Sequence, residues 1–292
     1  MPSTIVLRRR ISSVKNTKQI TKAMELVSAS KMRRAQDQAK LSREYRQLAY
    51  DLLARLSTIK EVENHPLFQK RAIHTQLYIV ITSDSGLAGA YNFNVLRQFT
   101  KSVTEDRDNG IKSNVIVIGK QGANFARRLS HINLLAVYPA FGDNPSANDI
   151  RPILNTLIES YYDKHVDEVN IIYTTFISNL VQKVQKLPIL PAKIEDTDDA
   201  KFIRTYPYTN FEPSAEIVVD NTASRLIEVQ IWQAMLESLA SEHSMRMLAM
   251  KNATDNASDI IDDLTLEFNT VRQSNITQEL AEISGGVEAL KD

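Results

Sequence analysis

The chain of 292 residues has no cysteine, only eight glycines and nine prolines, and a formal net charge of zero. The absence of cysteine excludes disulfides, thiolate-bound zinc, iron–sulfur clusters and a cysteine nucleophile, and it is compatible with a reducing compartment. No apolar run approaches the roughly 20 residues that a membrane-spanning helix needs. With 43% hydrophobic and 24% charged residues, the composition predicts a folded globular protein and excludes a disordered chain.

The zero net charge conceals two oppositely charged ends. Residues 1–60 carry 14 basic and 4 acidic side chains, whereas residues 210–292 carry 5 basic and 15 acidic ones. A basic segment alone would favour nucleic-acid binding. The equal and opposite acidic segment indicates instead that the two ends of the chain contact each other. Exposed ion pairs contribute only about 0–1 kcal/mol each, so this pattern directs pairing more than it stabilises the fold.

Glycine and proline divide the chain into three parts. Neither occurs from Ser3 to His65 or from Ser214 to Ser284, and both of these segments are rich in helix-forming residues. A continuous helix over residues 214–284 would be about 105 Å long. In this C-terminal segment, residues suited to a helix seam recur at steps of three and four, with one pair of consecutive fours at His243, which predicts a heptad pattern with a stutter. The expected seam is Val229, Trp232, Leu236, Leu239, His243, Met247, Met250, Thr254, Ala257, Ile261, Leu264, Phe268, Val271 and Asn275.

The N-terminal segment shows a weaker stripe at helical spacing, interrupted by polar residues. Two ordinary amphipathic helices of a bundle are one interpretation. An antiparallel pair formed by the two chain ends is the interpretation that we favour, because both segments are so long and carry opposite charge. The expected stripe is Ile11, Val14, Ile20, Met24, Val27, Met32, Leu41, Tyr45, Leu48, Leu52, Leu56 and Ile59.

The middle of the chain alternates short apolar runs with helical patterns, which predicts a mainly parallel sheet with helices on its faces. We therefore expect an α/β fold with a long antiparallel coiled coil, in which a Rossmann-like domain is inserted between two shaft helices. The expected parts are an N-terminal shaft helix over 1–60, an α/β domain over 66–208 and a C-terminal shaft helix over 210–286. Strands are expected at 77–82, 114–118, 133–138, 168–176 and 184–190, and helices at 91–101, 121–130 and 148–164.

Two glycine-containing turns follow expected strands and come before expected helices. The turn from Asp84 to Gly89 suits phosphate binding in its position, but it lacks both established phosphate-loop patterns, so we interpret it as a tight turn. The turn from Gly119 to Gly122 receives the same interpretation. The five histidines make no ligand-spaced cluster, and the adjacent acidic residues of the chain point in different directions on a helix. We therefore expect no catalytic set, no metal site and no cofactor.

The first 24 residues contain no acidic residue, and in this they are similar to a transit peptide. The same pattern continues into the helical segment without a break typical of a cleavage site. We therefore interpret these residues as the start of the long helix.

Long runs in both terminal segments resemble the gamma-subunit family of F-type ATP synthases. The runs are Arg10 to Met32, Arg246 to Ala257 and Val271 to Ile283, and in the middle Asp84 to Gly89 and Gly142 to Ser146 match turns of the same family. The resemblance covers essentially the whole chain, in order. The terminal runs are long and specific, whereas the central ones would be weak alone.

The resemblance implies a rotor without catalytic activity of its own. The two-helix shaft is expected to lie inside a hexamer of alternating alpha and beta subunits, and the α/β domain to lie with the epsilon subunit on a membrane ring, the c-ring. Flow of the coupling ion, H⁺ or Na⁺, would turn the ring and the shaft, and the turning shaft would drive ATP synthesis or hydrolysis in the hexamer. The resemblance implies no cofactor and no nucleic acid, and a peripheral position on the cytoplasmic side of a bacterial plasma membrane.

The resemblance also implies roles for seven residues. Met24 matches the part of the shaft that passes the moving lobe of the beta subunit. Phe211 and Glu212 match the segment that enters the C-terminal helix near the membrane ring and epsilon. Contacts with the hexamer are expected from Arg272, Gln273, Thr277 and Glu279.

The sequence departs from the family at Ser85, where Arg or Lys is common, so the charged contact made from that loop is not expected here. The cysteine-bearing regulatory insert of chloroplast relatives is absent. Two other functions remain as alternatives. One is a nucleotide-binding enzyme with helical oligomerisation arms, which direct nucleotide binding would reveal. The other is a nucleic-acid-binding coiled coil that uses residues 1–60, which salt-dependent DNA binding would reveal.

Overall fold

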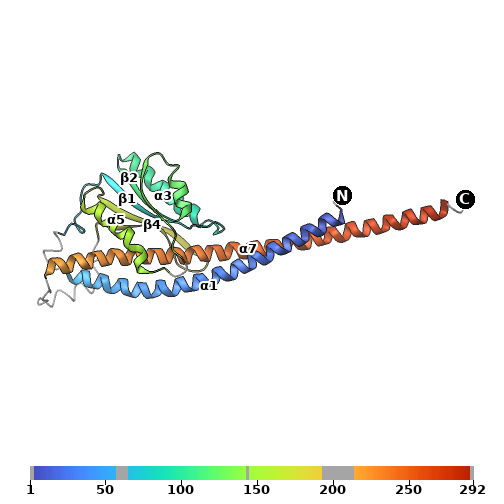
Figure 1. Cartoon of the computed structure of the whole chain (residues 1–292), viewed down its shortest axis with the longest axis horizontal. Coiled ribbons are helices and arrows are strands. Elements are labelled where there is room, and N and C mark those ends of the chain that lie inside the picture. The colour runs from blue at the N-terminus through green and yellow to red at the C-terminus, as the bar shows by residue number, and fades with distance from the viewer. Residues whose placement is uncertain (1–2, 57–64, 143–144, 193–213, 290–292) are drawn as a thin grey trace. The chain divides into compact units, whose positions relative to one another are not determined.

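A computed structural model describes residues 3–56, 65–142, 145–192 and 214–289. The chain forms two compact units. Residues 1–28 and 246–292 form one, which we call the helical unit, and residues 29–245 form the other, which we call the α/β unit. Two long helices, α1 (Thr4–Leu56) and α7 (Ala215–Ala289), each run through both units without a break (Figure 1). The prediction of two long terminal helices is confirmed.

The centre of the α/β unit is a five-stranded sheet in the order β3-β2-β1-β4-β5. Strands β1 (Thr75–Ile81), β2 (Lys112–Ile118), β3 (Ile132–Tyr138) and β4 (Glu168–Phe176) are parallel, and β5 (Gln182–Leu190) returns antiparallel beside β4. The chain moves from β1 outward to β3 and then returns to the other side of β1. The strand order therefore reverses between β1 and β4.

Helices cover both faces of this sheet (Figure 1). Helices α3 (Tyr91–Asp108) and α4 (Lys120–Ala126) pack on one face, where Tyr78, Val95 and Phe99 belong to one apolar cluster. Helix α5 (Arg151–Tyr162), which follows the 3₁₀ turn η1 (Ala147–Ile150), packs on the other face. The same face receives α7 through Ala223, Ile227, Ile231, Ala234 and Met235. Burial of such continuous apolar strands on both faces is typical of parallel sheets.

Within the α/β unit, α7 is buried on nearly every side from Leu226 to Ser244. Its apolar side chains meet the sheet, and polar side chains on its remaining surface are buried with partners. Glu237, for example, accepts hydrogen bonds from Arg43 on α1 and from Gln233. A helix buried all round needs such partners, because an unpaired buried charge is strongly unfavourable.

The expected strands are all present, but several helix bounds differ. The helix expected at 91–101 continues to Asp108, and the one expected at 121–130 ends at Ala126. The helix expected at 148–164 begins as η1, whose cap is Ser146 and whose Asp149 carboxylate accepts a hydrogen bond from the Ser146 amide at 2.8 Å. The α-helix itself therefore begins only at Arg151, because a 3₁₀ turn comes before it.

Candidate functional site

In the helical unit, α1 and α7 lie side by side and run in opposite directions. The Thr21 and Thr254 hydroxyls are 2.8 Å apart and buried, and the Arg8 guanidinium lies 5.7 Å from the centre of the Phe268 ring. Moving forward along α1 thus corresponds to moving backward along α7. The two chain ends contact each other, as the charge pattern predicts.

The expected seam of α7 is confirmed up to Val271. Each seam residue from Val229 to Val271 is buried or half-buried, whereas most residues between them in the helical unit are exposed. The last expected member, Asn275, is exposed, so that part of the prediction is wrong. The seam ends at Val271 because beyond this residue no described part of α1 covers α7.

The expected stripe of α1 is wrong in part. Ile20 and Val27 are 60% and 54% exposed, and Leu41 and Leu48 are also exposed. The buried face follows a regular heptad spacing, but many of its members are small or polar. These members are Thr4, Leu7, Ile11, Val14, Lys18, Thr21, Glu25, Ser28, Met32, Ala35, Ala39 and Ser42. Small side chains let two helices approach closely. Which residues of α1 are buried therefore depends more on side-chain size and on register with α7 than on hydrophobicity.

The buried pair Thr21 and Thr254 has only two hydroxyl protons for three short oxygen–oxygen contacts. The Thr21 hydroxyl lies 3.1 Å from the Lys18 carbonyl oxygen, and the Thr254 hydroxyl lies 2.8 Å from the Met250 carbonyl oxygen. Each hydroxyl has one proton, so at most two of these three contacts are hydrogen bonds at one time. The pair therefore fixes the register of the two helices while its proton positions remain free to exchange.

Beyond Val271, α7 continues to Ala289, and the side chains described there are exposed. Four of the predicted contact residues, Arg272, Gln273, Thr277 and Glu279, lie on this exposed end. The contact residues expected at this end are all polar, and its apolar stripe was not expected. Ile276, Leu280 and Ile283 are 48%, 60% and 64% exposed and follow the i, i+4, i+7 spacing of one helix face.

The other predicted contact residues divide into two groups. Met24 lies on α1 in the helical unit and is half-buried, so part of its side chain remains available to a partner. Phe211 and Glu212 lie outside the described residues. The structure thus brings Arg272, Gln273, Thr277 and Glu279 together on one helix end, apart along the chain from Met24.

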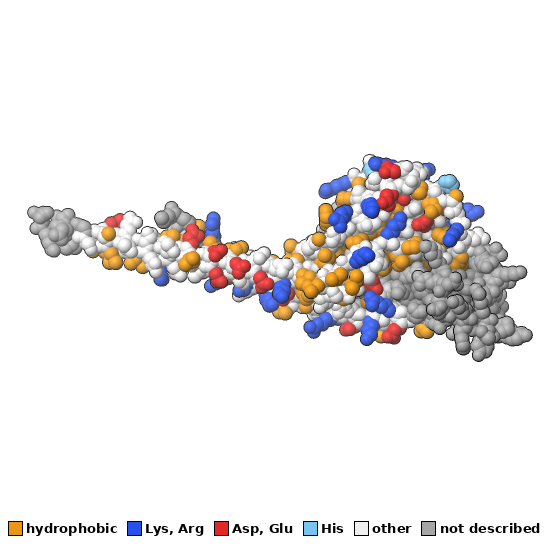
Figure 2. Space-filling model, turned by 180° about the vertical axis from the view of Figure 1, so that it is seen from behind, with side chains coloured by type: hydrophobic (Ala, Val, Ile, Leu, Met, Phe, Trp, Pro, Cys, Tyr) orange, Lys and Arg blue, Asp and Glu red, His pale blue; other side chains and the backbone are white. Residues whose placement is uncertain are grey.

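Charged side chains gather on the outer surface of the helical unit (Figure 2). On α7, Asp255, Asp259, Asp262 and Asp263 are exposed, while α1 exposes basic side chains from Arg8 to Lys22. In the α/β unit, an ion pair joins the two long helices directly, because Arg43 Nη2 lies 3.0 Å from Glu237 Oε1.

The turn from Asp84 to Gly89 uses its polar groups to hold the carboxyl edge of the sheet, by which we mean the edge where β1, β2, β3 and β4 end. Asp84 Oδ1 accepts hydrogen bonds from the backbone N–H of Lys120 and of Ala140, at 2.8 and 3.2 Å. The Gln121 N–H donates to the Ser83 carbonyl, and the Gly122 N–H donates to Thr82 Oγ1. The first N–H groups of α4, which a phosphate would need, are thus bound within the protein. These contacts give the turn from Gly119 to Gly122 a structural role between the ends of β1 and β2.

Gly119 is required where β2 meets α4. Its φ is +96°, and a Cβ atom there would lie 2.2 Å from the Thr82 carbonyl oxygen. Any side chain would separate the ends of β1 and β2, so this glycine serves close backbone approach.

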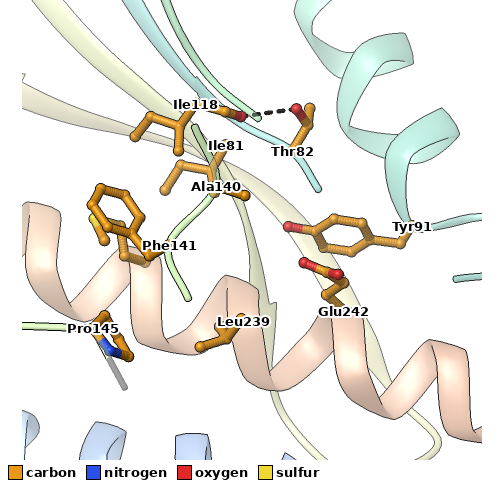
Figure 3. Close-up of a pocket in the computed structure, with 10 residues that line it drawn as sticks. Ile81, Thr82, Tyr91, Ile118, Ala140, Phe141, Pro145, Leu239 and Glu242 are labelled. Carbon is orange, nitrogen blue, oxygen red and sulfur yellow. Dashed lines mark hydrogen bonds between the residues drawn. The ribbon is translucent and has the colours of Figure 1, made fainter. Parts of the chain in front are cut away.

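A small cavity lies at the carboxyl edge between the sheet and α7 (Figure 3). Its volume is about 20 Å³, which is room for about one water molecule. Figure 3 shows the Tyr91 ring directed toward the Glu242 carboxylate, and the Tyr91 hydroxyl also lies 2.6 Å from Ser238 Oγ. The apolar part of the lining comes from Ile81, Ile118, Ala140, Phe141, Pro145, Met235 and Leu239. A cavity of this size does not hold a nucleotide.

A larger, polar cavity of about 290 Å³ opens between α3, β4, β5 and α7. Its lining includes two cations, Arg97 and Lys183, and no acidic side chain among the described residues. Sequence reasoning missed it because the lining comes from segments far apart in the chain. The complete lining is Tyr91, Asn94, Arg97, Gln98, Thr174, Gln182, Lys183, Val184 and Met245.

A buried polar network crosses the sheet beneath α3. The Tyr78 hydroxyl lies 2.8 Å from Asp106 Oδ2 and 2.6 Å from Gln76 Oε1, and it accepts a hydrogen bond from Lys186 Nζ at 3.2 Å. Burial, and then the hydrogen bond to Asp106, raise the pKa of Tyr78 far above its usual value. The network links β1 and β5 to α3 and has a structural role.

Among the described residues, no group of three or more His, Cys, Asp or Glu side chains is placed to hold a metal ion. None of the described helices is long and apolar enough to cross a membrane.

Comparison with known proteins gives a consistent result over the whole chain. A family model described as ATP synthase matches residues 3–290. The ATP synthase gamma chain of Roseiflexus sp. (strain RS-1) is 42% identical over 301 residues, which cover 100% of both chains. The ATP synthase gamma chain of Legionella pneumophila (strain Corby) is 36% identical over 284 residues, which cover 97% of this chain and 98% of the relative.

Solved structures show the same fold at lower identity. The central stalk of the Tetrahymena thermophila mitochondrial ATP synthase, solved with its c-ring, superposes with a TM-score of 0.63 at 23% identity, over 80% of this chain and 99% of that chain. A chain of the Euglena gracilis mitochondrial ATP synthase, solved as an OSCP/F1/c-ring assembly, superposes with a TM-score of 0.68 at 18% identity, over 98% and 94% of the two chains.

Proposed function

This chain belongs to the ATP synthase gamma chain family, and from that premise we propose that it is the central-stalk rotor of an F-type ATP synthase. In this role it couples ion movement through a membrane ring to ATP synthesis or hydrolysis in a hexamer of alpha and beta subunits. The structural observation that carries the proposal is the exposed end of α7. A helix that continues for more than four turns beyond Val271, with Ile276, Leu280 and Ile283 uncovered, is suited to a surrounding partner.

The exposed end has the two kinds of surface that a turning shaft needs. The apolar stripe excludes water against a sleeve without fixing one orientation, since apolar contact is non-directional. Arg272, Gln273, Thr277 and Glu279 supply polar contacts that form and break as the shaft turns. We assign these four residues of α7, and Met24 of α1, to contacts with the hexamer.

The paired part of the shaft has to transmit torque, and we infer that α1 and α7 form an antiparallel coiled coil in the helical unit. The alternating three-and-four burial on both helices supports this, as does the buried Thr21–Thr254 contact that sets their register. By function we divide the chain into shaft helices at 1–60 and 210–286 and an α/β domain at 66–208.

We assign no catalysis to the chain itself. The N–H groups that a phosphate loop would offer are bound by Asp84, Ser83 and Thr82, which favours the rotor over a nucleotide-binding enzyme. The nucleotide sites then belong to the alpha and beta subunits. The acidic exposed face of α7 beside the basic end of α1 likewise favours helix pairing over nucleic-acid binding.

The curated relatives reported above come from bacteria, so we place the complex at a bacterial plasma membrane, with this chain peripheral on the cytoplasmic side. There the α/β domain would contact the c-ring and the epsilon subunit. The family motif assigns Phe211 and Glu212 to that end.

The test is ATP hydrolysis by alpha and beta subunits of the same organism, with and without this chain. We expect a stable stoichiometric complex with raised, cooperative turnover. The double variant Arg272→Ala/Gln273→Ala should weaken coupling and lower ATP synthesis in membranes, while the control Asp259→Ala, exposed on the paired part of α7, should behave as wild type. A folded chain that forms no complex and changes no rate would contradict the proposal.

A further inference from the structure

The polar cavity between α3, β4, β5 and α7 has features of a binding site that the rotor function does not use. We propose that it binds a phosphate-class oxyanion, either free inorganic phosphate or the phosphoryl group of a nucleotide. The inference goes beyond the proposed function, because it concerns a site on this chain and none on the partner subunits.

The first support is the position of the cavity in the fold. In open α/β sheets, ligands bind outside the carboxyl ends of the strands, at the point where the strand order reverses. Here the reversal lies between β1 and β4. The cavity is lined by Tyr91 and Asn94 in the first turns of α3, which follows β1, and by Thr174 near the carboxyl end of β4.

The second support is charge. Arg97 and Lys183 approach the cavity from α3 and β5, and neither makes an ion pair with a described residue. No acidic side chain is among the described lining residues. The planar guanidinium of an arginine matches two phosphate oxygens at once, and a lysine adds a mobile point charge. The Arg97 guanidinium lies 5.8 Å from the centre of the Phe93 ring, a contact that leaves its charge without an anionic partner among the described residues. Two cations at one opening therefore favour an anionic ligand.

The third support is the set of neutral hydrogen-bonding groups below the cations. Asn94 and Gln98 lie at i and i+4 on the same face of α3 as Arg97, and their side-chain amides make no hydrogen bond with a described residue. Deeper, Thr174 is 3% exposed, and its hydroxyl has no partner among the described residues. An unpaired buried hydroxyl is unfavourable, and a ligand oxygen that reaches it removes that penalty.

The volume fits a small ligand. About 290 Å³ is far more than one water molecule needs, and it is at the lower end of the range for small-molecule pockets. Phosphate with its hydration water fits this space, and a nucleotide could enter only with its phosphoryl end.

The test is isothermal titration calorimetry of the purified full chain with inorganic phosphate, against sodium chloride at equal ionic strength. The isolated chain is used so that nucleotide sites of partner subunits do not contribute. We expect saturable phosphate binding by wild type and roughly tenfold weaker binding by Arg97→Gln/Lys183→Gln, because each lost cation removes a charge-assisted contact. The control Lys101→Gln/Arg107→Gln removes the same charge from α3 outside the cavity and should bind as wild type.

Thr174→Val provides a second variant that keeps the side-chain shape. It should retain or raise the urea midpoint of the chain without phosphate, and it should weaken phosphate binding severalfold. Parallel titration with ADP distinguishes the two sources, since tighter binding of ADP than of phosphate assigns the site to a phosphoryl group. The proposal is overturned if wild type shows no saturable binding, or if the control variant loses as much affinity as the cavity variant.

Discussion

Replacing Arg43 by methionine should destabilise the α/β unit by about 2 kcal/mol. Arg43 is half-exposed, and its guanidinium lies 3.0 Å from the Glu237 carboxylate, whose side chain is 6% exposed. Removing one partner of a buried ion pair costs about 3–5 kcal/mol, whereas an exposed pair contributes about 0–1 kcal/mol. This pair lies between the two cases. Gln233 still donates to Glu237 at 2.7 Å and limits the loss.

The only tryptophan of the chain makes this prediction measurable. Trp232 packs against the core cluster of the α/β unit, five positions before Glu237 on α7, so its fluorescence reports unfolding where the pair acts. With a denaturant slope of about 3 kcal/mol per molar urea, a loss of about 2 kcal/mol lowers the urea midpoint by about 0.7 M.

A double-mutant cycle then isolates the pair. Glu237→Gln should cost less than about 1 kcal/mol, because the Arg43 left alone is half-exposed and keeps its hydration. The double variant Arg43→Met/Glu237→Gln should be more stable than the sum of the two losses predicts, with a coupling of about 1–2 kcal/mol. The reasoning is refuted if the two single variants lose equal free energy of unfolding and these losses add up in the double variant. Glu237 would then gain no stabilisation from Arg43.

Three further predictions concern other parts of the molecule. Ile276→Ser/Leu280→Ser should leave the thermal unfolding of the isolated chain unchanged, since both residues are exposed, but should lower ATP synthesis in membranes, and Ser274→Ala should change neither. Asp84→Ala should lower the free energy of unfolding, measured in urea, by about 1–2 kcal/mol, because two backbone N–H groups lose their acceptor. An unchanged urea midpoint would contradict this and would mean that water replaces the carboxylate. The raised pKa of Tyr78 keeps its hydroxyl neutral in the folded chain, so stability from this residue is complete below pH 10 and is lost as pH rises above it. Urea midpoints above pH 10 should therefore fall less steeply in Tyr78→Phe, and parallel curves for the two proteins would contradict this.

The parts of the fold that sequence predicts well are those in which one signal dominates. Strand β4 was expected at 168–176 and has these bounds, because its apolar run is preceded by Asp167 and followed, one residue after its end, by the polar pair Ser178-Asn179. The antiparallel direction of β5 had no such signal. It follows from the short connection after β4, which allows a hairpin but is too short for a parallel crossover.

The register of α1 shows where hydrophobicity misleads. Ile20 and Val27 fit an apolar stripe, yet Thr21 and Ser28 beside them are buried. A hydroxyl on a helix can satisfy itself on its own backbone or on a facing hydroxyl, as Thr21 does, so burying it costs little. The exposed isoleucine and valine remain available for partners. Which face is buried depends on the other helix, and periodicity in one segment does not contain that information.

The candidate sites divide in the same way. The contact residues expected at the end of α7 could be proposed from sequence because they lie within one continuous run that resembles a known family. The cavity beside Thr174 was missed, because α3, β4, β5 and α7 each supply only one to four of its residues. Only the sheet order brings those segments together.

The central claim, that the chain turns within its complex, is tested most directly by observing rotation. Because the sequence has no cysteine, Asp108→Cys at the exposed end of α3 provides a single attachment site for a probe. In complexes held by their alpha and beta subunits, ATP should drive stepwise rotation of the probe in one direction, and the rotation should stop when ATP is removed. Complexes that hydrolyse ATP while a securely attached probe stays still would contradict the account.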